Sequence, residues 1–185
     1  MRLFVAVNLP GGVRDDLSRA AAPLRETPFP VKWIEPDGVH LTLKFLGDVA
    51  EERVPAVVSG IEDACRGVRV FTLGMSGFGA FPSAQRPRVI WVGCEPVPAL
   101  ELLQHGMERE MQLLGFPLDG RPFQPHLTLG RVRRGAGALP GFAALLDALS
   151  FECEFLVESV DLMQSTLSRA GARYTRRHAV PLEAG

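Results

Sequence analysis

Hydrophobic and polar positions in the first half of the chain alternate between strand-like and helix-like patterns. Residues 3–9 form a short run of aliphatic, aromatic and β-branched side chains that is typical of a buried strand. Residues 13–25 carry apolar side chains on one helical stripe and charges opposite it, which predicts a helix ended by Pro28 and Pro30. The pattern then predicts a strand over 39–46, a helix over 51–65 and strands over 68–75 and 88–93, with a loop at 77–83.

The second half of the chain repeats this order in outline. Apolar residues at helical spacing over 100–114 predict a helix that Gly115 ends, and the proline-rich link 120–125 leads into a strand over 126–133. A helix over 142–150 and strands over 151–163 and 173–182 follow. This order predicts an α+β fold with an approximate internal repeat. Because no Ser- or Gly-rich linker separates the two cycles, we expect residues 1–185 to form one domain of two related lobes.

The sequence His-Leu-Thr-Leu occurs twice, at residues 40–43 and 126–129, each time inside a predicted strand. Side chains on a strand alternate faces, so His40 and Thr42 share one face while the two leucines share the other. The same holds for His126 and Thr128. A single His-x-Thr in a strand is most often an ordinary half-buried pair. Two identical copies at matching places in a repeat favour a function instead.

Two such strands facing each other would bring two imidazoles to one bound group, with two hydroxyls between them. This arrangement suits cleavage at phosphorus, because one neutral histidine can accept a proton from water while one imidazolium protonates the departing alkoxide. The hydroxyls of Thr42 and Thr128 can donate hydrogen bonds to the phosphate oxygens. The two histidines lack a third metal ligand at helpful spacing, so we expect neither a metal nor a cofactor.

Composition excludes several other classes of protein. A net charge of −1 argues against a protein that coats nucleic acid generally, although Arg131, Arg133 and Arg134 cluster directly after the second motif. The 3 cysteines are odd in number and widely spaced, which indicates buried thiols rather than a disulfide framework or a zinc site. No apolar run is long enough to span a bilayer, and the start of the chain lacks the features of a signal peptide. We therefore expect a cytoplasmic protein without membrane contact.

Several stretches beyond the two motifs carry a resemblance to a known family. In order, they are residues 2–7, Trp33, 40–47, 81–82, 87–93, 123–126 and 165–167, followed by Gly171 and Tyr174. Together they resemble the two-histidine phosphoesterase superfamily, and within it the bacterial RNA 2′,3′-cyclic phosphodiesterase branch, historically called 2′-5′ RNA ligase. The resemblance implies a bilobal, pseudo-symmetric α+β fold, with two antiparallel sheets and flanking helices around a central cleft.

The resemblance also implies an activity, which is metal-independent hydrolysis of RNA 2′,3′-cyclic phosphate ends to 2′-phosphate ends. Carried over to this sequence, His40 and His126 would be the acid/base pair, and Thr42 and Thr128 would bind phosphate oxygens. We assign His40 as the proton donor to O3′ and His126 as the proton acceptor from water. The near symmetry of the site leaves the reverse assignment open.

The two copies of the motif diverge in the residues that follow them. Lys44 should lie on the His40 face, where it would either contact the phosphate or remain a solvated edge lysine. Arg131 falls on the leucine face of a regular strand, but a β-bulge would turn it toward the phosphate. Arginine at this position is frequent in the family branch, so we count Lys44 and Arg131 among the candidate substrate-binding residues.

The remaining expectations concern weaker candidates and other functions. Trp33, Phe81 and Phe123 are candidates for stacking on a nucleobase, with core packing as the alternative, while His105 and His178 are expected at the surface. Substrates would be RNA with cyclic-phosphate ends or small cyclic nucleotides, and we expect a monomer. Two other functions stay open: 2′-5′ RNA end joining at the same site, and a non-catalytic module that binds RNA ends.

Overall fold

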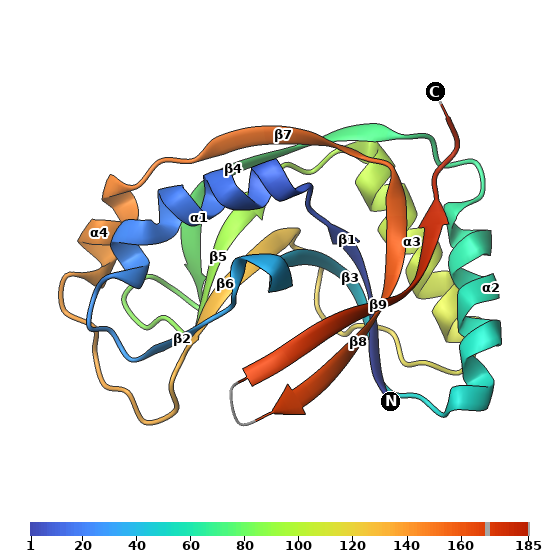
Figure 1. Cartoon of the computed structure of the whole chain (residues 1–185), viewed down its shortest axis with the longest axis horizontal. Coiled ribbons are helices and arrows are strands. Elements are labelled where there is room, and N and C mark those ends of the chain that lie inside the picture. Colours follow the sequence, from blue (N-terminus) through green and yellow to red (C-terminus); the bar gives the residue numbers. More distant parts are fainter. Residues whose placement is uncertain (169–170, 185) are drawn as a thin grey trace.

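A computed structural model describes residues 1–168 and 171–184 and contains a nine-stranded sheet with four α-helices (Figure 1). The strands are β1 Arg2–Asn8, β2 Val31–Trp33, β3 His40–Asp48, β4 Phe71–Phe81, β5 Val89–Cys94, β6 His126–Val132, β7 Glu152–Val157, β8 Ser159–Ser168 and β9 Gly171–Pro181. The helices are α1 Gly11–Arg25, α2 Val54–Cys65, α3 Pro98–Leu113 and α4 Phe142–Ala148. Short 3₁₀ turns cover 36–38 and 51–53.

The sheet has an approximate two-fold arrangement about the two motif strands. Its order is β7-β4-β5-β6-β3-β1-β8-β9, and β2 pairs with β6 outside this path. All the ladders between these strands are antiparallel, and the two halves are joined at the single pair Leu41–Leu127. The α+β, pseudo-symmetric fold is therefore confirmed, and its two antiparallel sheets are halves of one hydrogen-bonded sheet.

The chain exchanges strands between these halves. After α2 it crosses to place β4 beside β5, and after β7 it crosses back to place β8 beside β1. In Figure 1, α2 and α3 lie side by side at one end of the molecule, and α4 lies at the other end. Each half of the sheet thus contains strands from both cycles of the sequence repeat.

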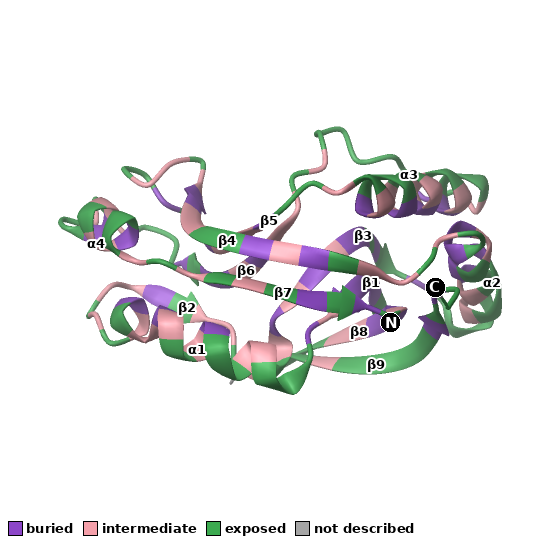
Figure 2. Cartoon of the chain, turned by 90° about the horizontal axis from the view of Figure 1, so that it is seen from above, coloured by how far each residue is buried: buried purple, intermediate pink, exposed green. Residues whose placement is uncertain are grey.

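One face of the sheet forms the main core beneath the helices. The four motif leucines are at most 2% exposed and pack in one cluster with α1, α2 and α3 through side chains such as Leu17, Val57 and Met107. Figure 2 shows exposed residues on the outer sides of the helices and buried ones toward the sheet. None of the described helices is both long and apolar enough to cross a membrane. The opposite face of the sheet carries the polar residues of the motifs and a small apolar cluster of Phe4, Ala6, Met163 and Tyr174.

Three sequence-based element assignments differ from the structure. The segment expected to be a loop at 77–83 continues as strand β4 as far as Phe81. Gly79 lets this strand pass beneath the indole ring of Trp91, because an added Cβ at Gly79 would lie 2.2 Å from that ring. The strand expected over 151–163 is two strands that separate at Glu158, where the chain changes sheet halves. The short strand β2 lies between proline-containing segments and was not predicted.

The three cysteines are free thiols, as the sequence predicts. Cys65 and Cys94 are buried, and desolvation raises the pKa of each to about 12. Cys153 is half-buried on β7. Thiols with such high pKa values are poor nucleophiles, which leaves the two buried cysteines a packing role.

Candidate active site

The two motifs meet face to face at the centre of the sheet. Leu41 pairs with Leu127 in an antiparallel register, which sets His40 across from Thr128 and Thr42 across from His126. All four polar side chains are half-buried and lie on the face opposite the leucines. The two histidines occupy diagonal positions, which a regular ladder separates by roughly 7–8 Å. Such a spacing would let both imidazoles reach the same small group.

Both imidazoles are held by the same kind of hydrogen bond. Nδ1 of His40 lies 2.7 Å from the carbonyl oxygen of Gly38, and Nδ1 of His126 lies 2.6 Å from that of Gln124. A carbonyl oxygen only accepts hydrogen bonds, so Nδ1 carries the proton in each ring. Nε2 is therefore the nitrogen left to exchange a proton with a substrate, as acceptor in the neutral ring and donor in the charged one.

Aromatic rings surround each imidazole, but differently in the two halves. The ring of Phe4 stacks on His40 at 4.7 Å between centroids, and Tyr174 meets it edge-on at 5.0 Å. His126 has Phe81 edge-on at 5.0 Å and the more distant Trp91 at 6.4 Å. The His40 side is thus the more tightly enclosed of the two.

This enclosure sets the protonation of the free site. Desolvation by burial lowers the pKa of His40 to about 4, the hydrogen bond to Gly38 opposes that shift, and the charge of Arg14 adds to it. Burial also lowers the pKa of His126, opposed by the bond to Gln124 and assisted by the charge of Arg131. In the absence of a bound anion, His40 is therefore neutral at pH 7.

A β-bulge lies at the same place in both motif strands, at the second leucine. On one side, Ala6 pairs with Thr42 and Val5 with Lys44, so Leu43 has no partner in β1. On the other side, Trp91 pairs with Thr128 and Ile90 with Gly130, so Leu129 has no partner in β5. A bulge inserts one residue and reverses the alternation of faces beyond it. The residues that follow each motif therefore point to the faces opposite to those expected from a regular strand.

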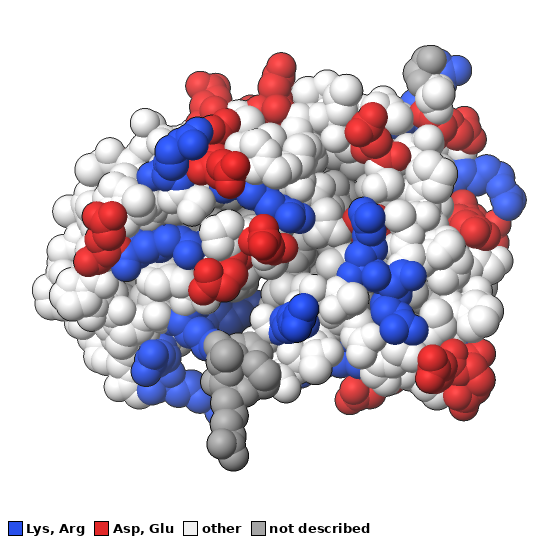
Figure 3. Space-filling model, viewed as in Figure 1, with Lys and Arg blue, Asp and Glu red and all other residues white. Residues whose placement is uncertain are grey.

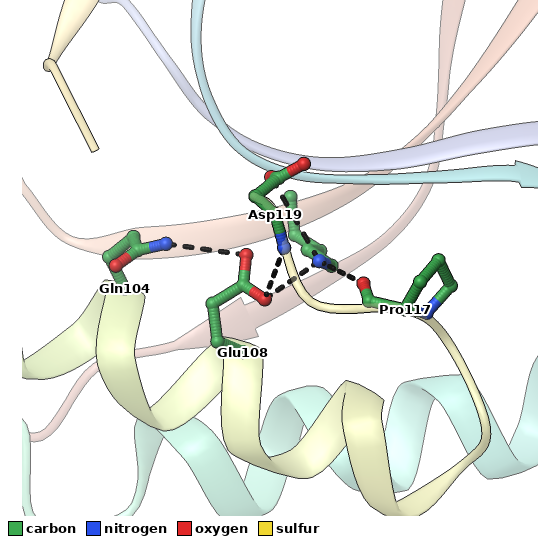
Figure 4. A network of polar contacts seen from close by, with 5 residues as sticks. Gln104, Glu108, Pro117 and Asp119 are labelled. Carbon is green, nitrogen blue, oxygen red and sulfur yellow. Dashed lines mark hydrogen bonds and ion pairs between the residues drawn. The ribbon is translucent and has the colours of Figure 1, made fainter. Parts of the chain in front are cut away.

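Lys44 does not lie on the His40 face, and the expectation that it would is wrong. The bulge turns it into the core, where it is 1% exposed and donates hydrogen bonds to Glu108 at 2.7 Å and to the carbonyl oxygen of Pro117 at 2.6 Å (Figure 4). The carboxylate of Asp119 lies 3.9 Å from the ammonium group. Lys44 thus fixes α3 and the loop after it to β3, and it cannot serve the substrate from there.

The second bulge has the opposite consequence for Arg131. Gly130 takes the buried position equivalent to Lys44, and an added Cβ there would lie 2.7 Å from both Val31 and Trp33. Arg131 is exposed and turns to the His126 face, where its charge lowers the pKa of that histidine. Position 45, its counterpart after the first motif, is Phe45, which faces Phe4 at 6.1 Å. One half of the site is therefore cationic beyond its motif and the other half is aromatic.

The weaker aromatic and histidine candidates separate in the structure. Trp33 lies on the core side beneath the guanidinium of Arg25, at 5.6 Å, and Phe123 packs against the main core. Among the three aromatic candidates, Phe81 is the one beside a motif histidine. The remaining two histidines, 105 and 178, are exposed, as expected.

Sequence reasoning missed a buried polar cluster beside the first motif. Asp161 is 1% exposed and accepts a hydrogen bond from Asn8 at 2.6 Å, while Arg176 lies 3.9 Å from the same carboxylate. Asn8 pairs with His40 in the ladder between β1 and β3. A polar residue that ends an apolar strand, as Asn8 does, was the only available signal, because β8 reaches this site from the far end of the chain.

No group of three or more potential metal-ligating side chains is found within residues 1–168 and 171–184. The polar groups of the two motifs are two imidazoles and two hydroxyls, and the guanidiniums of Arg14 and Arg131 lie near enough for their charges to act on the histidines. Such a set can exchange protons with, and donate hydrogen bonds to, an anionic group with several oxygens.

Comparison with known proteins agrees with a site that acts on phosphate esters. The family model described as LigT like Phosphoesterase matches the chain twice, over residues 7–91 and 92–174. The chain belongs to this family. The two matches divide it between the two motifs, in agreement with the internal repeat. Relatives named RNA 2′,3′-cyclic phosphodiesterase include one from Methanothermobacter thermautotrophicus, 36% identical over 95% of each chain, and one from Thermus thermophilus, 35% identical over 95% of this chain and 87% of the relative.

Solved structures show that the whole phosphoesterase fold is shared. The Thermus thermophilus protein TT0787 superposes with a TM-score of 0.84 and 31% identity over 98% of each chain. Escherichia coli LigT in complex with 3′-AMP gives a TM-score of 0.79 and 29% identity over 98% of this chain and 97% of LigT. The resemblance read from the sequence is thereby confirmed at the level of family and fold.

Proposed function

We propose that this phosphoesterase hydrolyses RNA 2′,3′-cyclic phosphate ends and leaves a 2′-phosphate. The observation that carries the proposal is the pair of imidazoles on one face of the sheet, each with Nδ1 bound to a backbone carbonyl. The names of the relatives supply the class of substrate. A cyclic phosphodiester needs one proton removed from water and one delivered to the departing oxygen, and two imidazoles meet that need.

In the proposed reaction, water attacks phosphorus and the bond from phosphorus to O3′ breaks. Nε2 of His126 takes the proton of the water, and Nε2 of His40 gives a proton to O3′. The hydroxyls of Thr42 and Thr128 donate hydrogen bonds to the two non-bridging oxygens, whose charge rises in the transition state. Arg131, on the His126 face, adds a positive charge beside the same phosphate.

The assignment of His40 as proton donor carries a condition. With a pKa of about 4 in the free protein, His40 must gain its proton as the anionic substrate binds beside it. Burial lowers the pKa of His126 as well, so a neutral ring in the free protein is common to both histidines and does not by itself assign the base. Bis(4-nitrophenyl) phosphate separates the two assignments, because its leaving group needs no acid. Turnover of this diester should survive in His40→Ala and be lost in His126→Ala; the opposite pattern would reverse the roles.

The activity itself is tested with an oligonucleotide that ends in a 2′,3′-cyclic phosphate, incubated in EDTA. Phosphorus NMR should show conversion of the cyclic diester to a 2′-monoester in the wild-type protein. Formation of a 3′-monoester would contradict cleavage of the bond to O3′. Loss of turnover in EDTA would indicate a metal enzyme, and no turnover in any buffer would favour a non-catalytic module that binds RNA ends.

End joining is the same displacement at phosphorus, with the hydroxyl of a 5′ end in place of water as the nucleophile and O3′ again as the leaving group. Adding such an acceptor strand to the same reaction distinguishes the two activities, because joining yields a longer product. We expect hydrolysis to dominate because water is in large excess. A monomeric state and a cytoplasmic location stay predictions, the first of which size-exclusion chromatography with light scattering can test.

A further inference from the structure

Three cations share the open face of the sheet beyond the second motif. Lys32 of β2 pairs with Arg131 of β6, so the two side chains lie on the same face, and Arg133 returns to that face two residues later. The backbone N–H of Arg133 donates to the carbonyl of Pro30 at 2.8 Å, which continues the β2–β6 ladder to this point. We call Lys32, Arg131 and Arg133 the basic strip.

The basic strip begins at the active site and leads away from it. Arg131 is close enough to His126 for its charge to lower the pKa of that imidazole. From His126 to Arg133, β6 and its continuation extend on the order of 20 Å at the usual rise of a strand. That length exceeds one nucleotide. A nucleic acid strand whose end lies between the histidines and whose preceding nucleotides follow β6 would contact all three cations.

The charge of the strip is not balanced by neighbouring acids. All three side chains are exposed, and among the described residues no ion pair involves any of them. Segments 27–34, 76–94 and 120–146, which supply this end of the sheet, contain no aspartate or glutamate. In Figure 3, blue side chains gather at the lower left, around the end of the sheet that carries β2, without red ones among them. In a chain of net charge −1, this is a local concentration of positive charge.

The other half of the site differs in the residue that follows its motif. The position equivalent to Arg131 is Phe45, which is 62% exposed and faces the ring of Phe4. Arg176 on that side lies 3.9 Å from the carboxylate of Asp161, and Arg14, whose charge reaches His40, lies 3.9 Å from the carboxylate of Asp37. The two halves thus differ directly after their motifs, where one carries the cation Arg131 and the other the aromatic Phe45.

We propose that the basic strip binds phosphodiester groups on the 5′ side of the nucleotide that carries the cyclic phosphate. The inference rests on the proposed function and narrows its substrate class: the preferred substrate is an RNA strand, and a mononucleotide cyclic phosphate fills only part of the site. Each bound phosphate of a single strand contributes about 0.7 to the slope of log affinity against log salt. At 0.1 M salt, loss of one contact therefore costs about fivefold in affinity, and loss of two about 25-fold.

The test compares a ten-nucleotide RNA ending in a 2′,3′-cyclic phosphate with adenosine 2′,3′-cyclic phosphate. In the double variant Lys32→Ala/Arg133→Ala, KM for the RNA should rise about 25-fold and its salt slope should fall by about 1.4, while kcat/KM for the mononucleotide stays within about twofold. The matched control is Arg69→Ala, which removes an exposed arginine from the segment that bridges to Glu183. Arg69→Ala should leave KM and kcat/KM unchanged for both substrates.

Equal effects on both substrates, or no effect on the RNA, would overturn the proposal. Binding of a fluorescent RNA with a 2′-phosphate end, followed by anisotropy, gives a second readout that needs no turnover. If the wild-type protein turned over neither substrate, the proposed function would fail. The basic strip would then be tested by RNA binding alone: a smaller salt slope in the double variant would support it, and an unchanged salt slope would contradict it. Circular dichroism of the variants checks that they remain folded.

Discussion

Burial of His40 predicts that the stability of the protein falls in mild acid. The imidazole lies between Phe4 and Tyr174, and desolvation lowers its pKa to about 4. In the unfolded chain the same group titrates near 6.5. Between these two values the unfolded state binds a proton that the folded state does not. This contribution to stability is therefore complete above pH 6.5 and is lost as the pH falls toward 4.

The size of the effect follows from the shift. Lowering the pKa from 6.5 to about 4 corresponds to about 3.5 kcal/mol in full, at about 1.4 kcal/mol for each tenfold change in proton affinity, of which about 3 kcal/mol is lost by pH 4. At pH 5 the loss is about 2 kcal/mol. Because small domains are stable by only about 5–15 kcal/mol, such a loss is readily measured.

Urea unfolding of the wild type and of His40→Gln at pH 7 and pH 5 isolates this term. Glutamine does not titrate, so the difference in unfolding free energy between the two proteins should shift by about 2 kcal/mol in favour of the variant at pH 5. His105→Gln, which replaces an exposed histidine on α3, is the control and should parallel the wild type. A pKa near 6.5 for His40 by NMR, with parallel curves for all three proteins, would refute the reasoning.

Three further variants test other parts of the site. Lys44→Met leaves the carboxylate of Glu108 buried without its partner, so it should lower the unfolding free energy in urea by about 3 kcal/mol. The molecules that remain folded should keep the wild-type kcat. A loss of kcat at unchanged stability would mean that Lys44 contacts the substrate after all. Gly130→Ala places a Cβ 2.7 Å from the ring of Trp33 and should cost about 1–3 kcal/mol by the same assay, whereas an unchanged midpoint would show that the neighbours yield freely. Thr128→Val removes one hydroxyl donor without changing the shape of the side chain and should lower kcat by about 10²-fold; a change in KM alone would mean that the hydroxyl serves binding and not the transition state.

Strand alternation alone predicted the central feature of the site correctly. The period of two assigned His40, Thr42, His126 and Thr128 to one face and the leucines to the other, and the observed burial agrees. That inference needed only local geometry. The pairing of β3 with β6 also follows from the repeat, since two equivalent strands that bury the same residues can meet at a shared axis.

The residues beyond the motifs were not predictable in the same way. A bulge exists only relative to the neighbouring strand, and β1 and β5 each pair with the motif strands one residue short. No local pattern in the sequence of the motif strands predicts this one-residue difference in pairing. It reversed the face of Lys44 and brought Arg131 to the site. The exchange of β4 and β8 between the halves was equally hidden, and with it the approach of Tyr174 to His40.

The central claim is that two imidazoles act on one phosphate. A crystal structure with the product analogue adenosine 2′-monophosphate tests it most directly. The Nε2 atoms of His40 and His126 should each lie within about 3.2 Å of oxygens of the same phosphate group. A phosphate bound to one histidine alone, or held away from both, would contradict the claim.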